Sequence, residues 1–190
     1  MPGALLLCSA SPRRAALLAA AGVAFEPGRP PEVDETPPEG VAPAEVAQAL
    51  AVRKARAAAS RAPGRVVVTA DTFVLLGDAI LSKPEDAADA RRMLRALSGR
   101  VHRVVTGVAV ARDATVLSAS DATSVEFRSL SEEEIAAYVA TGEPLDKAGA
   151  YAIQGGASGF VVRREGRLDT VVGLPVDVVR RLVADIGTAG

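Results

Sequence analysis

Cysteine, histidine and aromatic residues are scarce in this chain of 190 residues. The single cysteine, Cys8, permits no internal disulfide and no thiolate metal cluster, which fits a reducing compartment. The single histidine, His102, supports neither a zinc site nor a Ser-His-Asp triad, and we expect it to be structural. Aromatic residues make up 3% of the chain and Trp is absent, so we expect a core of Val, Leu, Ile and Ala.

A strong net charge and long apolar runs are also missing. The formal net charge of -1 argues against a general polyanion-binding surface and leaves room only for a local positive field. We therefore expect no nucleic-acid partner, all the more because stacking aromatics are few. No apolar run approaches the ~18 residues that a membrane span needs, and the first arginines follow the apolar stretch 5–8 instead of preceding it as in a signal peptide. We expect no membrane partner and a cytoplasmic location.

Segments typical of strands and of helices are interleaved along the chain. The 49% of hydrophobic and 24% of charged residues are typical of a globular protein, and the length suits one domain over residues 1–190, with room for two lobes. Two long segments, 101–112 and 116–127, alternate like an antiparallel pair, and 160–164 with 168–172 is expected to form a hairpin. Helices are expected over 12–21, 44–61, 85–97, 132–140 and 176–186. This mixture predicts an α/β fold with a central mixed sheet flanked by helices.

An apolar, β-branched run over residues 65–70 is followed by Asp71 and Thr72. Continuous valines predict a buried strand that ends at Asp71. A carboxylate in that position is costly to desolvate, and open α/β sheets bind ligands at the carboxyl ends of strands. Asp71 is therefore the first candidate for chemistry. The alternative is that Asp71 only caps the turn into the next strand.

A second candidate site lies where the apolar stretch 5–8 leads into a helix. Ser11 is expected to cap this helix, with Pro12 as its first residue and a glycine at its end. Arg13 and Arg14 then lie in the first turn, where the helix dipole disfavours cations. Hydroxyls, free N–H groups and two guanidiniums at such a turn indicate an anion site. The alternative is that the arginines are solvated surface residues.

Further polar groups lie in loops or on a helix. Glu35 belongs to a Pro-rich connection over 27–43, which is longer than a compact domain usually spends on a structureless loop. Lys54 lies on a long Ala-rich helix. The ordinary alternative for Glu35 is an acidic loop exposed to solvent, and for Lys54 a basic helix face exposed to solvent. Two acids with several cations suit a metal-bound polyphosphate, and no Walker A motif is present. The full candidate set is Ser9, Ser11, Arg13, Arg14, Glu35, Lys54, Asp71, Thr72, Lys83 and Gln154.

Short motifs in a fixed order extend this set over nearly the whole chain. The ordered set resembles the Maf family of nucleoside triphosphate pyrophosphatases, with small departures at Cys8, Ser82 and Asp169-Thr170. The motifs are Ser9-Ala10-Ser11-Pro12-Arg13-Arg14, Asp34-Glu35, Ala70-Asp71-Thr72, Lys83-Pro84, Leu97-Ser98-Gly99-Arg100-Val101-His102, Asp146-Lys147-Ala148-Gly149-Ala150-Tyr151-Ala152-Ile153-Gln154-Gly155 and Val171-Val172-Gly173-Leu174-Pro175.

The resemblance implies two lobes with a cleft, as in the inosine triphosphate pyrophosphatases, and a homodimer. It also implies a divalent metal cation, Mg²⁺ or Mn²⁺, held by Glu35 and Asp71, with Asp71 as the general base. The substrate-binding residues that it implies are Ser9, Arg13, Arg14, Lys54, Lys83 and Gln154.

Three positions indicate which base the resemblance favours. Groups within the family differ at the positions of Arg13, Thr72 and Gln154, and this combination resembles the members that act on dTTP and UTP. A Gln amide offers the donor and the acceptor that a pyrimidine imide edge requires. The resemblance therefore predicts hydrolysis of a nucleoside triphosphate, dTTP or UTP, to the monophosphate and pyrophosphate. The alternative is a nucleotide-binding regulator of cell division and septum formation, which would need the cations but not Asp71 as a base.

Overall fold

The computed structural model describes residues 4–188, which form two compact units. The first unit contains the described residues up to Asp71, together with Thr106–Asp121 and the segment from Gly173 onward. The second contains Thr72–Val105 and Ala122–Val172. Among residues 4–188, no helix combines the length and the apolar character needed to cross a lipid bilayer.

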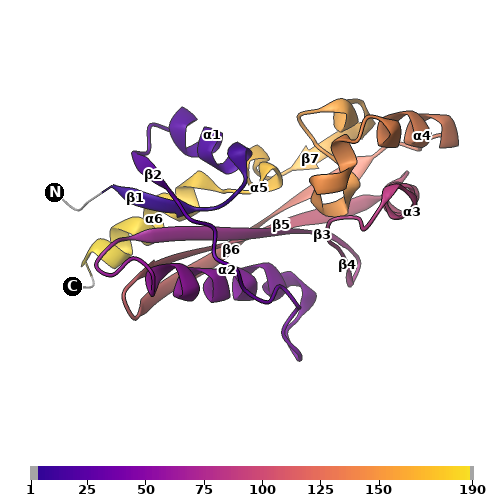
Figure 1. Cartoon of the computed structure of the whole chain (residues 1–190). Helices are drawn as coiled ribbons and strands as arrows, with labels where there is room; N and C mark the ends of the chain where they lie inside the picture. The colour runs from indigo at the N-terminus through magenta and orange to yellow at the C-terminus, as the bar shows by residue number, and fades with distance from the viewer. Residues whose placement is uncertain (1–3, 189–190) are drawn as a thin grey trace. The chain divides into compact units, whose positions relative to one another are not determined.

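The strands form a mixed sheet, which confirms the predicted α/β class (Figure 1). The strand order is β2-β1-β3-β5-β6-β7, and β4 pairs with β3. β1 is parallel to β2 and β3, whereas β3–β4 and β6–β7 are antiparallel. The strands are β1 (Leu5–Cys8), β2 (Phe25–Gly28), β3 (Val67–Leu76), β4 (Ala79–Leu81), β5 (Val101–Arg112), β6 (Thr115–Phe127) and β7 (Val161–Glu165).

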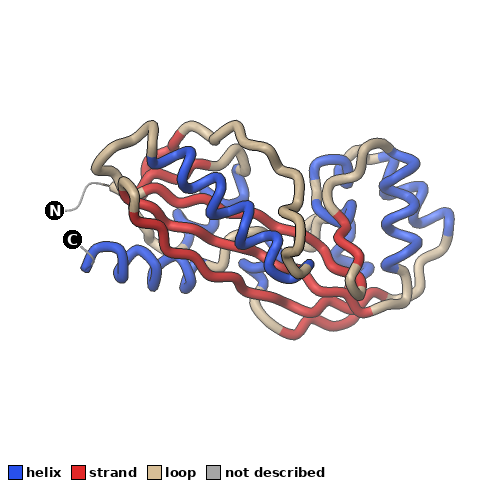
Figure 2. The backbone as a smooth tube through the Cα atoms, turned by 90° about the horizontal axis from the view of Figure 1, so that it is seen from below, coloured by secondary structure: helices blue, strands red, loops and turns tan. Residues whose placement is uncertain are grey.

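Helix α2 (Pro43–Ala59) lies against the strands of the first unit (Figure 2). Five of its seven buried residues are alanines, and these small side chains allow a close approach to the sheet. Gly107 on β5 makes the contact closer still, because a Cβ atom there would lie 2.3 Å from the backbone carbon of Ala47. Helices α1 (Pro12–Ala20) and α6 (Val176–Thr188) contribute to a separate aliphatic cluster with β1, β3 and β5.

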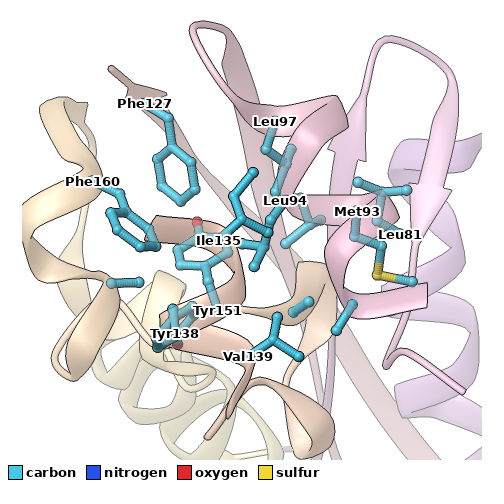
Figure 3. Packing of buried hydrophobic residues seen from close by; sticks show 14 of the residues in the cluster. Leu81, Met93, Leu94, Leu97, Phe127, Ile135, Tyr138, Val139, Tyr151 and Phe160 are labelled. Carbon is cyan, nitrogen blue, oxygen red and sulfur yellow. The ribbon is translucent and has the colours of Figure 1, made fainter. Parts of the chain in front are cut away.

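The second unit has a different core, built around aromatic rings (Figure 3). Four of the six Phe and Tyr residues are buried there, so the expected all-aliphatic core is correct only for the first unit. His102 lies among these rings, 98% buried, with Nε2 at 2.9 Å from the Tyr151 hydroxyl, and is structural as expected. The helical elements are α3 (Ala87–Leu97), α4 (Glu132–Ala140), η1 (Glu143–Asp146), η2 (Ala148–Ala150), η3 (Gly156–Phe160) and α5 (Leu168–Val172).

Two predictions about strands are wrong. β3 does not end at Asp71 but continues to Leu76, since its pairing with β4 outweighs the polar interruption. The segment 168–172 is helix α5 instead of the second strand of a hairpin. Thr123 on β6 donates a 2.9 Å hydrogen bond to the Arg167 carbonyl, which holds the chain just before α5. This contact comes from a distant segment, so local β propensity could not reveal it.

Candidate active site

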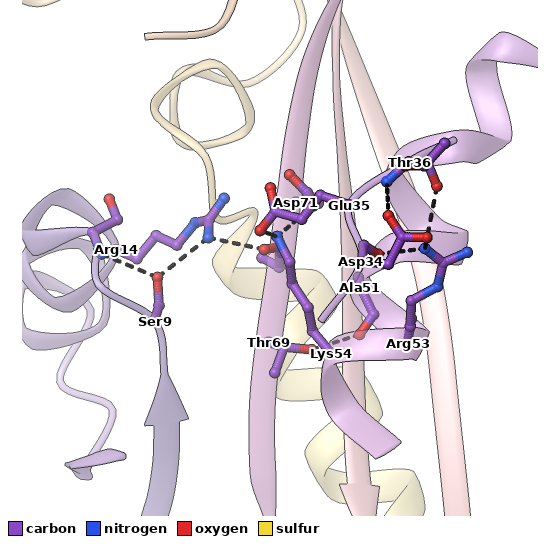
Figure 4. Close-up of polar contacts among 12 residues, drawn as sticks. Ser9, Arg14, Asp34, Glu35, Thr36, Ala51, Arg53, Lys54, Thr69 and Asp71 are labelled. Carbon is purple, nitrogen blue, oxygen red and sulfur yellow. Dashed lines mark hydrogen bonds and ion pairs between the residues drawn. The ribbon is translucent and has the colours of Figure 1, made fainter. Parts of the chain in front are cut away.

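The ammonium group of Lys54 lies between two carboxylates of the first unit (Figure 4). Lys54 Nζ is 2.6 Å from Asp71 Oδ2 and 2.9 Å from Glu35 Oε1. The side chains of Lys54 and Asp71 are each 13% exposed, whereas that of Glu35 is 65% exposed. The two acids come from a strand and a loop, and the lysine joins them. The structure therefore brings together three of the predicted site residues.

The position of Lys54 follows from the way α2 packs. Thr69, which is fully buried on β3, donates a 2.7 Å hydrogen bond to the carbonyl of Ala51 on α2. Two alanines that flank Lys54 in the sequence, Ala51 and Ala55, are fully buried. Lys54 thus projects from a helix that is fixed against β3, the strand that carries Asp71.

The loop segment that carries Glu35 is held by the neighbouring helix residue, Arg53. The guanidinium of Arg53 donates to the carbonyl of Asp34 and, at 3.1 Å, to that of Thr36. The Thr36 amide donates a 2.8 Å hydrogen bond to Asp34 Oδ1, which closes a tight turn. Hydrogen bonds from Thr36 lower the pKa of Asp34. Arg53 and Lys54 therefore hold the loop at three successive residues, two of them by backbone atoms.

The first turn of α1 contains a half-buried arginine network. Arg14 donates to three oxygen atoms: from Nε to the Gly173 carbonyl at 2.8 Å, and from Nη1 to the Ala70 carbonyl at 2.9 Å and to Ser9 Oγ at 3.2 Å. Ser9 Oγ also accepts a hydrogen bond from the Ser11 amide. The Ser11 side chain makes no cap hydrogen bond, so the prediction that Ser11 caps the helix by its hydroxyl is wrong. The Ser11 amide donates instead to the side chain of Ser9, the first residue after β1.

The electrostatic surroundings of Arg14 link this network to the carboxylates. Burial lowers the pKa of Arg14, and the negative charges of Asp71 and Glu35 partly reverse this effect. The positive charge of Arg13 acts in the same direction as burial. Two cations and two acids therefore influence one another within the first unit.

The two carboxylates that contact Lys54 are the candidate ligands for a divalent cation. Among the described residues no group of three or more His, Cys, Asp or Glu side chains is gathered as a ready-made metal site. Mg²⁺ commonly binds one or two protein carboxylates and completes its shell with water and substrate phosphates. Glu35 and Asp71, which contact the same ammonium group, fit that donor set.

The remaining predicted residues belong to the second unit. Thr72 follows Asp71 within β3 and is partly buried. Lys83 is exposed in the loop after β4, where the carbonyl of Ser82 accepts a 3.0 Å hydrogen bond from the Gly149 amide. Gln154 is exposed between η2 and η3. The roles of these three residues stay predictions.

Comparison with known proteins identifies the family. Residues 4–186 match the family described as Maf-like protein. The chain belongs to the Maf family. Three relatives named dTTP/UTP pyrophosphatase align with this chain over almost the whole length of each protein. That of Geobacter sulfurreducens is 51% identical, over 96% of this chain and 98% of its own. Those of Citrifermentans bemidjiense and Anaeromyxobacter dehalogenans are each 49% identical, over 98% and 96% of this chain and 97% and 94% of their own.

A solved structure titled "Structure of a HAM1 protein from Coxiella burnetii" is a more remote match. It has 19% sequence identity and a TM-score of 0.45, and the alignment covers 65% of this chain and 72% of that one. At this TM-score the likeness supports no conclusion about the Maf chain.

Two contributors to the site of this Maf chain are not evident from its sequence. Arg53 stands beside Lys54 as one more cation, although it is the residue that holds the loop around Glu35. Nothing in the local sequence distinguishes Arg53 from any other helix-surface arginine. Gly173 lies in one of the ordered motifs, which is the signal that could have marked it, and its carbonyl accepts from Arg14.

Proposed function

We propose that this Maf-family chain is a nucleoside triphosphate pyrophosphatase that hydrolyses dTTP and UTP to the monophosphate and pyrophosphate. Relatives of nearly equal length that share about half of the sequence are named dTTP/UTP pyrophosphatase. The observation that carries the mechanism is the convergence of Asp71 and Glu35 on the ammonium group of Lys54. Acids beside cations are what hydrolysis of a charged phosphoanhydride requires.

Asp71 is the proposed general base. Its carboxylate takes a proton from a water molecule whose oxygen forms a bond to the α-phosphorus. The bond between that phosphorus and the bridging oxygen to the β-phosphorus breaks, and the diphosphate leaves with the bonding electrons. Lys54 orients the carboxylate of Asp71 and offers positive charge to the phosphate oxygens.

A divalent cation, Mg²⁺ or Mn²⁺, is the proposed cofactor, with Glu35 and Asp71 as its protein ligands. When bound, it would supply positive charge to the phosphate oxygens during bond breaking. The support is the chemistry of two carboxylates that approach the same point.

The remaining proposed substrate contacts are divided between phosphates and base. Ser9, Arg13, Arg14 and Lys83 are proposed to bind the triphosphate, which suits their hydroxyl and cationic groups. Arg13, Thr72 and Gln154 are proposed to select the base. A site that pairs with a base edge rejects analogues strongly, because a wrong base leaves buried polar groups unpaired.

We also propose a homodimer in the cytoplasm, acting through one Maf domain over residues 1–190. The match over residues 4–186 supports the single domain. The homodimer rests on the family resemblance. A nucleoside triphosphate substrate and one buried Cys8 without a disulfide favour a reducing cytoplasmic setting.

Pyrophosphate release tests the proposed function. The purified chain is incubated with dTTP, UTP, CTP, ATP, GTP and 7-methyl-GTP, each with Mg²⁺, with Mn²⁺ and with a chelator. We expect dTTP and UTP to be turned over fastest and the chelator to abolish activity. Equal turnover of purine and pyrimidine triphosphates would refute the substrate assignment. Nucleotide binding without any turnover would favour the regulator over the enzyme.

A further inference from the structure

The short segment that carries Gln154 is held by side chains at both of its ends. At one end, the Ala152 amide donates a 2.9 Å hydrogen bond to the Tyr138 hydroxyl. At the other, the Gly156 amide donates a 2.9 Å hydrogen bond to Glu143 Oε2. Between them, the Gly155 amide donates to the Ala152 carbonyl at 3.0 Å and closes a turn. Backbone atoms on either side of Gln154 are therefore fixed by the residues of another segment.

The carboxylate of Glu143 occupies space that only a glycine leaves open. A Cβ atom at Gly155 would lie 2.0 Å from Glu143 Oε1, far inside contact distance. A Cβ atom at Gly156 would lie 3.0 Å from the ring of Tyr138. The two glycines thus let Tyr138 and Glu143 approach the backbone beside Gln154 closely.

Glu143 is itself well placed for this contact. Its amide donates to Thr141 Oγ1 at 3.2 Å, and its carbonyl accepts from Lys147 Nζ at 3.3 Å. Burial raises the pKa of Tyr138, and the neighbouring carboxylate of Glu143 raises it further. The Tyr138 hydroxyl therefore stays protonated.

The side chain of Gln154 makes no hydrogen bond of its own to any other residue in the described part of the chain, although the backbone on either side of it is held by hydrogen bonds. This side chain is exposed. A fixed backbone sets the position from which the side-chain amide of Gln154, a donor and an acceptor, reaches a ligand, so that only the side-chain rotamers are ordered on binding. We propose that Glu143 is a positioning residue for nucleobase selection, acting through the Gly156 amide to orient Gln154. This inference rests on the proposed pyrimidine nucleotide pyrophosphatase function.

Two single variants test the inference by different routes. Glu143→Ala removes the acceptor, and Gly155→Ala pushes the flexible carboxylate away from the same place. Each is expected to lower the ratio of kcat/KM for dTTP to that for GTP by about 10- to 100-fold, since a displacement near 1 Å can cost that much. Glu143→Gln keeps an oxygen acceptor and should retain most of the preference.

The double variant Glu143→Ala/Gly155→Ala tests whether the two substitutions act through the same contact or independently of one another. The three nearest atoms that a Cβ at Gly155 would meet all belong to the carboxylate of Glu143, so Gly155→Ala should change the ratio little in the Glu143→Ala background. Amide exchange at Gly156 should accelerate in both single variants. Glu132→Ala, which removes another carboxylate of the second unit bound to Arg95, is the control and should change neither readout.

The outcomes distinguish the inference from the proposed function. A wild-type protein that prefers dTTP, combined with an unchanged ratio in a folded Glu143→Ala variant, would overturn the inference alone. Equal effects of Gly155→Ala with and without Glu143 would also overturn it. If Glu143→Ala does not fold, an unchanged ratio in Gly155→Ala is sufficient to overturn it. A wild-type protein that releases no pyrophosphate would refute the proposed function first.

Discussion

Arg14 Nε donates a 2.8 Å hydrogen bond to the carbonyl oxygen of Gly173, 159 positions further along the chain. The same guanidinium also binds the Ala70 carbonyl, next to the candidate base Asp71. Arg14 therefore ties the start of α1 to β3 and to the segment before α6. From the sequence, a cation at a helix start indicates an anion-binding residue without a stabilising contribution. The structure gives Arg14 a stabilising task as well.

Replacement of Arg14 by Ala is expected to destabilise the fold. Two carbonyl groups would lose their charged donor, at a cost of about 1–3 kcal/mol in the free energy of unfolding. Lys83→Ala, at an exposed position, is expected to raise KM with unchanged stability. Urea denaturation of the three proteins measures the difference. Equal stability of wild type and Arg14→Ala would show that the network contributes nothing to folding.

Asp71→Asn is expected to remove the general base while keeping a side chain of nearly the same shape. We expect an intact fold, retained nucleotide binding and a fall in kcat of about 10²- to 10⁴-fold. Asp78→Asn, in the exposed β3–β4 turn, serves as a matched control with unchanged kcat. Steady-state pyrophosphate release and calorimetric binding measure both quantities. Near-normal kcat in folded Asp71→Asn would refute its assignment as base.

Arg53→Ala is expected to loosen the loop around Glu35. Loss of the donor to the Asp34 and Thr36 carbonyls should accelerate amide exchange over residues 34–36. A displaced Glu35 should then lower kcat/KM by at least about tenfold. Arg61→Ala, exposed just beyond the end of α2, should leave both quantities unchanged. Similar exchange in the two variants would mean that the loop does not depend on Arg53.

Gln154→Glu is expected to erode the preference for pyrimidine triphosphates. A carboxylate accepts hydrogen bonds but cannot donate to the imide edge, so the kcat/KM for dTTP and UTP should fall towards that for GTP. CTP should be a poor substrate of the wild type, because its exocyclic amine reverses the donor pattern. An unchanged preference in the variant would show that Gln154 does not select the base.

His102 makes stability depend on pH. Burial lowers its pKa from 6.5 to about 4, although a backbone hydrogen bond at Arg100 opposes the shift. Between these pH values the unfolded chain binds a proton that the folded chain does not. The free energy of unfolding should therefore fall with decreasing pH, by up to about 1.4 kcal/mol per unit from this group. Denaturation at pH 7 and pH 5 should show a weaker dependence in His102→Gln, and an identical slope would contradict this.

Much of the secondary structure and the set of candidate residues could be predicted from the sequence alone. β1, β5 and the helix that begins after Ser131 follow from local patterns, and a capping box between Ser131 and Glu134 begins this helix. These features depend on hydrogen bonds and apolar periodicity within a few residues. The ordered motifs also lead to the Maf family, which the family match confirms.

How the candidate residues are held depends on the tertiary structure. Asp71 lies within a continuous strand because β4 pairs with the residues beyond it, and segment 168–172 is helical beside a contact from Thr123. Arg53, Arg14 and Glu143 act on backbone atoms of segments outside their own element. Such contacts depend on which surfaces meet after folding. The residues next to Arg53, Arg14 or Glu143 in the sequence do not predict these contacts, because each contact needs a partner from a distant segment.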